Sequence, residues 1–292
     1  MRAAGSSLAL DERTGRCMTA PAASRAVLEE RAGLPVLRWP GLDALGVQAV
    51  VTTRDGGVST GPYASLNLGL HVGDDPDAAV VNRRRAAAAV GLDLDELVFC
   101  AQSHGREVVT VTAADRGRGT RNLDDAVPKA DALVTREADL GLVVMVADCV
   151  PIVLLDPRQG VLATVHAGWR GTVAGVTSAA IGAMVALGSD PTEVYAAIGP
   201  AVPAARYEVG DEVAASARAA FGPAADEVVT PRPGGRWSFD LWAANRLQLA
   251  ASGIQAAKVF SGERPTGDGT PFFSDRALRP CGRFAAIARL TG

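Results

Sequence analysis

Residues 141–171 read GLVVMVADCVPIVLLDPRQGVLATVHAGWRG, and they set the architecture of the chain. Three apolar runs, at residues 142–146, 152–155 and 162–165, are separated only by short segments that contain Asp, Pro or Gly. Runs of this length between turn-forming residues are typical of buried β-strands. We therefore expect three strands in quick succession, followed by a helix over residues 171–187.

Similar apolar runs flank this stretch on both sides. The pattern predicts further strands at residues 47–53, 97–102, 107–111, 132–135, 194–198, 257–260 and 284–288. It predicts further helices at residues 77–91, 211–220 and 240–252. Because groups of adjacent strands are separated by helices, without a regular βαβ alternation, we expect the α+β (mixed α/β) class with mixed sheets.

The chain is expected to form a single domain over residues 35–292, because no linker-like stretch follows residue 40. Residues 1–34 are rich in Ala, Ser, Gly and charge and lack a strand pattern, which indicates a loosely ordered N-terminal extension. One or two helical turns are expected around residues 23–31.

The composition excludes several classes of protein. Hydrophobic residues make up 48% of the 292 residues and charged residues 21%, as in ordinary globular proteins. There are 29 Lys and Arg against 32 Asp and Glu, and this net charge of −3 lacks the basic field that nucleic-acid binding usually needs. The longest apolar run, residues 141–155, is shorter than the roughly 20 residues of a membrane span. We therefore expect neither a nucleic-acid nor a membrane partner.

The cysteines indicate a reducing compartment. The chain has four, Cys17, Cys100, Cys149 and Cys281, with no CxxC pair, so neither a disulfide scaffold nor a zinc ribbon is indicated. The first 30 residues carry charges and have no apolar core of the kind that a secretion signal needs. We expect a cytoplasmic protein, monomeric by default.

Polar residues follow three of the predicted strands, in the segments QSHG (102–105), ADCVP (147–151) and HAGWRG (166–171). They contain Cys149 and two of the chain's three histidines, His104 and His166; the third is His71. One thiolate and two imidazoles are three ligands that suit zinc and leave a fourth position for water. The same residues could also form a Cys–His catalytic pair or lie in the core, and the residues alone leave these interpretations open.

These segments belong to a set that resembles the laccase-domain family, also called multicopper polyphenol oxidase or FAMIN-like purine nucleoside phosphorylase. The set consists of TTRDGGVSTGPYASLNLGLHVGDDP (52–76), QSHGREVV (102–109), KADALVT (129–135), VADCVPIVLLDP (146–157), VHAGWRGTVAGV (165–176), AIGPAV (197–202), YEVGDEV (207–213), FDLWAANRLQLAASGI (239–254) and FFSDR (272–276). The resemblance covers about residues 40 to 290. It implies a three-layer α/β/β arrangement with mixed sheets, and zinc bound by His104, Cys149 and His166.

The resemblance also implies an activity. It is the phosphorolysis of adenosine, inosine, guanosine and methylthioadenosine, together with the hydrolytic deamination of adenosine. Zinc chemistry makes the deamination intelligible, because a zinc-bound water loses a proton near neutral pH and can attack C6 of adenine. The expected small-molecule partners are purine nucleosides and phosphate.

Several further residues receive expected roles. Cys149 and His166 are expected to be catalytic as well as ligands, and Asp148 either acts as the general acid/base or orients a ligand. Arg170 lies in HAGWRG, which runs directly into a predicted helix, and the free N–H groups of the helix start together with its guanidinium would bind phosphate. Further expected substrate contacts are Arg54, Asn67 and Arg276. Asp275, in FFSDR, stands where the family commonly has an aromatic residue.

A laccase mechanism is excluded by counting. A multicopper oxidase of that kind needs about ten histidines for its copper centres, and this chain has three. Phenol oxidation would have to come from adventitious copper in the one His-Cys-His site in vitro.

Two other functions use the same atoms differently. Cys149 could be the nucleophile, with a histidine as base, of a cysteine hydrolase that edits peptidoglycan precursors; the family's fold is similar to that of the cytotoxic necrotizing factor deamidases. A non-catalytic zinc protein or partner-binding module is the third reading, but structural zinc sites are closed by four protein ligands and the motifs provide three.

Overall fold

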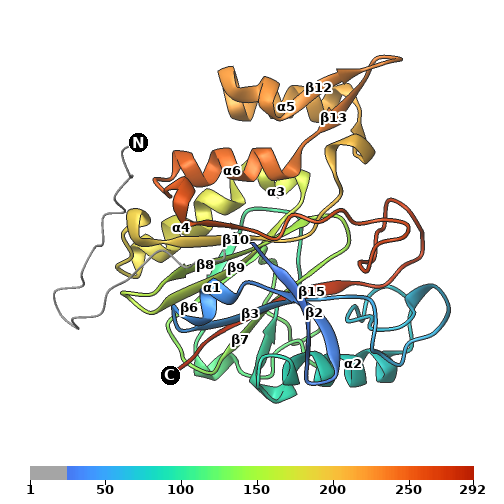
Figure 1. Cartoon of the computed structure of the whole chain (residues 1–292), viewed down its shortest axis with the longest axis vertical. Coiled ribbons are helices and arrows are strands. Elements are labelled where there is room, and N and C mark those ends of the chain that lie inside the picture. The colour runs from blue at the N-terminus through green and yellow to red at the C-terminus, as the bar shows by residue number, and fades with distance from the viewer. Residues whose placement is uncertain (1–24) are drawn as a thin grey trace, which may run out of the picture.

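Two six-stranded sheets lie face to face in the computed structural model, which describes residues 25–292 (Figure 1). The first sheet has the order β1 (Val27–Arg31), β2 (Leu34–Arg38), β3 (Val47–Thr52), β15 (Phe284–Leu290), β7 (Gly141–Val146) and β4 (Leu97–Phe99). The second has the order β14 (Val259–Ser261), β10 (Tyr195–Ile198), β8 (Val150–Asp156), β9 (Val161–Ala167), β6 (Ala132–Thr135) and β5 (Val108–Thr110).

Both sheets are mixed. Most neighbours are antiparallel, but β4 pairs with β7, β5 with β6 and β10 with β14 in parallel. A third sheet, β11 (Glu208–Val209), β13 (Arg236–Phe239) and β12 (Val229–Arg232), is antiparallel throughout. The helices of the described residues are α1 (Pro40–Asp43), α2 (Pro76–Ala88), α3 (Trp169–Ala174), α4 (Val176–Ala186), α5 (Asp211–Phe221) and α6 (Leu241–Ala251). These elements confirm the expected mixed class and the single domain.

The central strands are buried on both faces, which explains their unbroken apolar sequences. Along β8, Ile152 and Leu154 face the helices, whereas Val153 and Leu155 face the other sheet. Successive side chains of a strand point to opposite sides, so a strand between two layers needs apolar residues at every position. Each such side chain stabilises the fold by roughly 1.5–3 kcal/mol.

The buried side chains on the two faces of the second sheet join three layers. Figure 1 shows α3, α4 and α6 over one face of the second sheet, while the first sheet packs against its other face. This is the expected three-layer α/β/β arrangement. One addition is α2, which covers the outer face of the first sheet through Ala86 and Ala87, against Val143 and Ile287.

Three predictions about elements were wrong. The helix expected over residues 171–187 is two helices, because Gly175 between them has φ 85°, a left-handed conformation that ends α3. Of the helical turns expected around residues 23–31, none forms in the described residues 25–31, and residues 27–31 form β1, which pairs with β2. The sheet thus begins inside the expected extension 1–34, whose residues 1–24 lie outside the described residues.

The three-stranded sheet was missed altogether. Its strands are short and partly exposed, with burial patterns that do not alternate cleanly, so they carry no strong apolar signal. Together with α5 it stands above the layer of α3, α4 and α6 in Figure 1. Arg218 of α5 lies over the ring of Trp237 in β13, with 4.0 Å from Cζ to the ring centre, which ties helix and sheet together.

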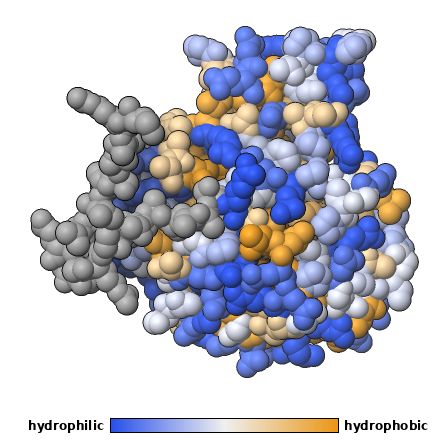
Figure 2. Space-filling view, viewed as in Figure 1, coloured by the Kyte–Doolittle hydropathy of each residue, from blue (hydrophilic) through white to orange (hydrophobic). Residues whose placement is uncertain are grey.

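The surface is mixed in character. Figure 2 shows hydrophilic residues over much of one face, with smaller hydrophobic patches between them. Within residues 25–292 no helix combines the length and the apolar character that crossing a membrane requires.

Candidate metal and active site

Three strand ends bring His104, Cys149 and His166 together. His104 lies in the loop after β4, Cys149 directly precedes β8, and His166 lies in β9, where its backbone pairs with Pro151. The ligand atoms of the three side chains all lie within 4.8 Å of one another. The two imidazole rings meet edge to face, with centres 4.7 Å apart. His166 is buried, Cys149 is half-buried and His104 is exposed, so one side of the group faces the surroundings.

Asp131 holds this group in place. It directly precedes β6 and is fully buried, and its Oδ1 lies 2.8 Å from Nδ1 of His166 and accepts a 2.9 Å hydrogen bond from the backbone N–H of His104. Its Oδ2 accepts from the backbone N–H of Gly105 at 2.7 Å and from the hydroxyl of Ser103 at 2.9 Å. One carboxylate therefore fixes both the loop that carries His104 and the ring of His166, and leaves Nε2 of His166 for a ligand.

Asp131 was not among the site residues predicted from the sequence. It stands in KADALVT, one of the segments that carry the family resemblance. The signal that could have found it is a lone carboxylate placed directly before a fully apolar strand, since a buried charge needs strong partners.

The QSHG loop is fixed from its other side by Gln102. Its side-chain amide accepts a hydrogen bond from the backbone N–H of Met145 at 2.8 Å and donates one to the carbonyl of Met145 at 2.7 Å, as a neighbouring strand would. His104 has φ 59°, which a residue with a Cβ adopts only when its surroundings hold it there. Asp131 and Gln102 supply those restraints.

Two glycines let HAGWRG approach the ligands closely. A Cβ at Gly168 would lie 2.8 Å from Sγ of Cys149 and 3.1 Å from Cδ2 of His104. A Cβ at Gly171 would lie 2.6 Å from the carbonyl oxygen of Gly105. Because atoms this close would clash, the start of α3 can lie against the site only with glycine at these two positions.

The charges of the site stabilise one another. Burial alone would raise the pKa of the Cys149 thiol, but the charge of His166 and hydrogen bonds from both histidines outweigh it and lower that pKa. Burial would likewise lower the pKa of His166, but Cys149 and Asp131 raise it. Asp131 stays ionised, since the hydrogen bond and charge of His166 hold its pKa well below the ordinary value against the effect of burial. Cys149 is thereby biased toward the thiolate, the form that binds metals.

The donor set fits a zinc ion. Two imidazole nitrogens and one thiolate are common zinc ligands, with bonds of about 2.0–2.3 Å. Atoms within 4.8 Å of one another are close to the span that one ion imposes. Within the described residues no fourth Cys, His, Asp or Glu joins the group, and three protein ligands with an open position are typical of catalytic sites.

His104, Cys149 and His166, called the metal group below, border a cavity of about 580 Å³. This metal cavity has a size that suits a small-molecule ligand. Leu123, Met145 and Val146 contribute apolar wall. The polar residues that line it, besides the metal group and Gln102, are His71, Asp275, Arg279 and Arg283. Arg279 and Arg283 were not among the site residues predicted from the sequence, although charged residues gather between FFS and the last strand.

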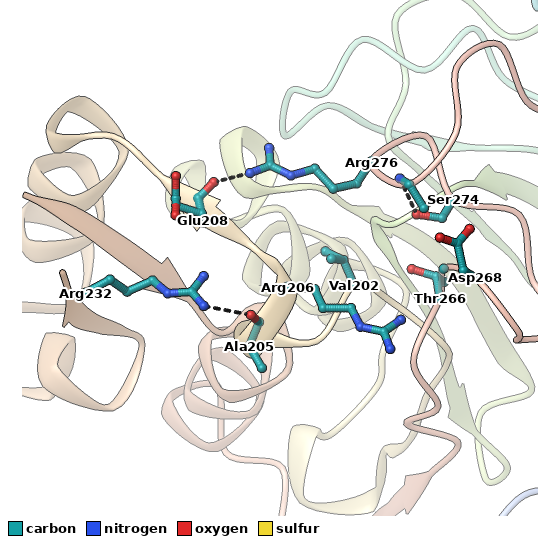
Figure 3. Close-up of a pocket in the computed structure, with 11 residues that line it drawn as sticks. Val202, Ala205, Arg206, Glu208, Arg232, Thr266, Asp268, Ser274 and Arg276 are labelled. Carbon is teal, nitrogen blue, oxygen red and sulfur yellow. Dashed lines mark hydrogen bonds between the residues drawn. The ribbon is translucent and has the colours of Figure 1, made fainter. Parts of the chain in front are cut away.

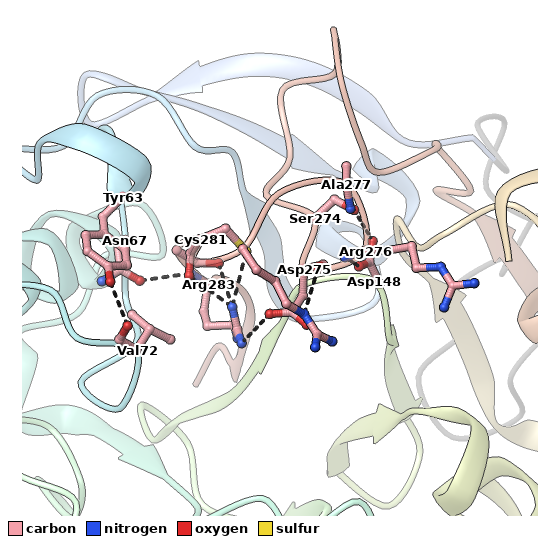
Figure 4. Close-up of polar contacts among 12 residues, drawn as sticks. Tyr63, Asn67, Val72, Asp148, Ser274, Asp275, Arg276, Ala277, Cys281 and Arg283 are labelled. Carbon is pink, nitrogen blue, oxygen red and sulfur yellow. Dashed lines mark hydrogen bonds and ion pairs between the residues drawn. The ribbon is translucent and has the colours of Figure 1, made fainter.

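Asp148 lies beside this cavity and is bound to the C-terminal segment. Its carboxylate accepts hydrogen bonds from the hydroxyl of Thr266 at 2.5 Å, and from the hydroxyl of Ser274 and the backbone N–H of Arg276, both at 2.7 Å. Figure 4 shows the contacts with Ser274 and Arg276. Its φ of 92° is again left-handed. These contacts attach residues 266–276 to the start of β8.

The expected substrate contacts lie away from the metal cavity. Arg54 donates through Nε and Nη2 to the carbonyl of Ala64 and does not line the cavity. Asn67 is buried and bonds to Gly69, to Asp74 and to the backbone N–H of Arg283, so it braces the loop that carries Arg283. Figure 4 shows this loop and the neighbouring pair of Asp275 with Arg283.

The other two expected contacts are more accessible. Arg170 is exposed and lies over the ring of Trp169, with 4.5 Å from Cζ to the ring centre. Arg276 is exposed and lines a second pocket (Figure 3). Neither side chain lines the metal cavity.

Fold and site together define a mixed α/β protein with an open His-Cys-His metal group in a ligand-sized cavity. The family model described as "Multi-copper polyphenol oxidoreductase laccase" matches residues 48–291, and the chain belongs to this family. The resemblance inferred from the motifs is thereby confirmed.

The relatives carry a more specific name. "Purine nucleoside phosphorylase YlmD" of Geobacillus stearothermophilus is 42% identical over 240 residues, which are 80% of this chain and 86% of that protein. "Purine nucleoside phosphorylase" of Deinococcus radiodurans is 42% identical over 222 residues, 76% of this chain and 80% of that protein.

Solved structures share the fold. The crystal structure of YlmD from Geobacillus stearothermophilus matches with a TM-score of 0.86 and 38% identity, over 91% of this chain and all of that chain. A Bacillus licheniformis hypothetical protein, YfiH, matches with a TM-score of 0.83 and 31% identity, over 87% of this chain and 96% of that one.

Proposed function

We propose that this protein is a zinc-dependent purine nucleoside phosphorylase that also deaminates adenosine. The observation that carries the proposal is the open His104–Cys149–His166 group in a cavity of about 580 Å³, in a chain 42% identical to proteins named purine nucleoside phosphorylase. The proposed substrates are adenosine, inosine, guanosine and methylthioadenosine, with phosphate as co-substrate.

In phosphorolysis, an oxygen of phosphate forms a bond to C1′ of the ribose while the bond from C1′ to the purine nitrogen breaks. The electron pair of that bond leaves with the base, which takes up a proton, and the products are the free purine and ribose 1-phosphate. When bound, zinc supplies a Lewis acid that stabilises developing negative charge and activates water near neutral pH, which is the chemistry that deamination needs.

The chain's own residues bind and orient the reactants. We propose that Leu123, Met145 and Val146 pack against the purine, and that Arg170 and Arg276 contribute positive charge for phosphate. Asp131 keeps His166 oriented, and Asp148 holds the segment that carries Arg276. Arg54 and Asn67 enter the proposal as residues that shape the surrounding loops, because their polar atoms bond to protein groups.

Zinc is proposed in preference to copper. The family's descriptive name refers to several coppers, but the three histidines of this chain are too few for a blue and a trinuclear centre. A thiolate with two imidazoles suits zinc as a Lewis acid. Copper bound at the same three residues in vitro would account for phenol oxidation without a laccase mechanism.

A second candidate is the cysteine hydrolase that edits peptidoglycan precursors. The observation that favours it is the series Cys149, His166 and Asp131, in which the carboxylate lies 2.8 Å from Nδ1 of the histidine and the histidine lowers the pKa of the thiol. A base oriented by a third group beside a nucleophile is the arrangement of catalytic triads. Because zinc and nucleophilic attack compete for the same thiolate, one tightly bound zinc per chain would speak against the hydrolase.

The test follows adenosine by chromatography with zinc-quantified protein, with and without phosphate, alongside Cys149→Ala. We expect adenine that depends on phosphate, and inosine that does not, both lost in the variant. Thermal unfolding checks that the variant is folded. Unchanged adenosine in the presence of one zinc per chain would overturn the nucleoside assignment. A cytoplasmic, monomeric state is part of the proposal, and size-exclusion chromatography checks the monomer.

A further inference from the structure

A second pocket, of about 530 Å³, lies beside the metal cavity and is lined by three arginines (Figure 3). Arg206 comes from the 3-10 turn Ala204–Arg206, Arg232 from the end of β12, and Arg276 from the loop before β15. Within residues 25–292, none of these guanidinium groups has a carboxylate partner within 4.0 Å. Three cations without a directly paired carboxylate give the pocket positive charge, which favours the binding of an anion.

The backbone holds two of these arginines in position. Nη2 of Arg232 donates to the carbonyl of Ala205 at 2.9 Å, and Nη2 of Arg276 donates to the carbonyl of Glu208 at 2.6 Å. Neutral carbonyls fix the side chains without cancelling their charge. Gly267 leaves room for the third arginine, Arg206, because a Cβ at position 267 would lie 2.9 Å from Nη1 of Arg206.

The carboxylates that line the pocket do not cancel its charge. Glu208 forms an ion pair of 2.9 Å with Arg236, which does not line the pocket, and among the described residues Asp268 forms no ion pair with any of the three arginines. In the metal cavity the situation is different, since Arg279 and Arg283 both pair with Asp275. The uncompensated positive charge near the site therefore lies in the second pocket.

The two cavities share a wall. Ser274 and Arg276 line the second pocket, whereas Asp275 between them lines the metal cavity. Ser274, Thr266 and the backbone of Arg276 all donate hydrogen bonds to Asp148, the residue next to Cys149. A ligand in the second pocket thus lies against the segment that shapes the metal site.

We propose that the pocket of Arg206, Arg232 and Arg276 binds a phosphoryl dianion, either free phosphate or the phosphoryl group of a sugar phosphate. Guanidinium groups match the oxygens of phosphate with parallel N–H donors, and three of them can surround one dianion. This inference extends the proposed function, in which Arg276 already contributes charge for phosphate, but anion binding is measured separately from nucleoside turnover. Phosphorolysis would use free phosphate and produce a sugar phosphate.

The test is calorimetric titration of the zinc-loaded full chain with inorganic phosphate in one arm and ribose 1-phosphate in the other. Arg206→Gln and Arg232→Gln are each expected to weaken binding about tenfold or more, as loss of a charged hydrogen-bond donor does. Arg218→Gln is the matched control, because it removes the same charge from α5 without lining the pocket, and it should bind within about twofold of the wild type.

The two arms separate the sources of the anion. Binding of phosphate alone identifies the free ion, and tighter binding of ribose 1-phosphate identifies the sugar phosphate. Thermal unfolding checks that each variant is folded. Arg206 is more exposed than Arg232 and lies outside β12, so Arg206→Gln tests the pocket without changing that strand. The proposal is overturned when neither ligand binds, or when the double variant R206Q/R232Q binds as tightly as R218Q. Either result leaves the chromatographic test of nucleoside turnover unaffected.

Discussion

At the residue scale, Asp131 connects the two histidines of the metal group. Replacing it by Asn keeps the size but removes the charge that pairs with His166 and weakens acceptance from the N–H groups of residues 103–105. We expect Asp131→Asn to lower zinc affinity by about 10–100-fold, the usual cost of losing a carboxylate that orients a ligating histidine. Competition with a chromogenic chelator measures the zinc affinity.

Asp156→Asn is the matched control. Asp156 is equally buried and accepts hydrogen bonds from the backbone N–H groups of Arg158 and Gln159, but it lies at the far end of β8 from Cys149. This variant should be less stable and bind zinc normally. Equal zinc affinity in the two variants would show that Asp131 supports only the fold.

Asp131 also predicts a dependence of stability on pH. Its pKa is held well below the ordinary value in the folded state, so the unfolded chain takes up the proton first as the pH falls. The stabilisation is therefore complete above the unfolded pKa of about 4 and is lost progressively below it. Urea unfolding of the metal-free protein between pH 3 and 6 should show the wild type losing its advantage over Asp131→Asn toward the acid end. A constant difference across that range would contradict the assignment.

Gly168 gives a second prediction at this scale. An added Cβ would meet Sγ of Cys149 at 2.8 Å and His104 at 3.1 Å. Gly168→Ala should therefore displace a ligand and reduce zinc content and turnover by at least about tenfold, as loss of ligand orientation does. Gly182→Ala, in α4 with no atom within 4 Å of the added Cβ, should bind zinc normally and gain about 0.4–1 kcal/mol of stability. Zinc retained in full by Gly168→Ala would contradict the close-packed geometry.

The candidate ligands, Asp131 and the pocket arginines differ in how far the sequence alone identifies them. His104, Cys149 and His166 stood out because histidines are rare in this chain and these two follow predicted strands, and the family resemblance then named the three as zinc ligands. Asp131 was not named, because it acts mainly on backbone N–H groups of residues 103–105, which lie 26–28 positions earlier in the chain, and only its place before an apolar strand marks it. Arg206 and Arg232 share a pocket only once the three-stranded sheet, which the sequence did not predict, has formed.

At the scale of elements, Gly175 separates α3 from α4. Its φ of 85° is accessible to glycine without strain, and no atom lies within 4 Å of a Cβ built there, so strain of the backbone is the whole cost of a side chain. We expect Gly175→Ala to destabilise the protein by about 1–2 kcal/mol, and Gly175→Asn by less, because Asn tolerates this conformation better. Urea unfolding measures both. A more stable Gly175→Ala would mean that the two helices can merge into the single helix that the apolar pattern predicted.

The strands show that a sequence predicts buried strands more readily than exposed ones. Strands β6, β7, β8 and β9 were predicted because both of their faces are buried, so their sequences are continuous apolar runs. Strand β1 was missed because its side chains are mostly exposed and include Glu29 and Arg31, so its pairing with β2 leaves no apolar pattern.

At the scale of the whole molecule, the metal group joins the two main sheets. His104 follows β4 of the first sheet, whereas Cys149 directly precedes β8 and His166 lies in β9 of the second sheet. A bound zinc ion therefore cross-links the layers and binds only the folded chain, so its removal must lower stability by mass action. With free zinc at 100 times its dissociation constant the effect is roughly 2.7 kcal/mol, or about 5–10 °C in Tm for a domain of this size.

Differential scanning calorimetry with and without a chelator measures this shift. Cys149→Ala lacks the thiolate and should show a much smaller shift, which separates binding at this group from adventitious binding elsewhere. Restoring zinc should recover both Tm and turnover, whereas copper should recover Tm alone if the reaction needs the Lewis acidity of zinc. An unchanged Tm after verified removal of zinc would mean that the three residues do not bind the metal tightly. Cys149 would then remain a free, low-pKa thiol beside His166, as the hydrolase requires.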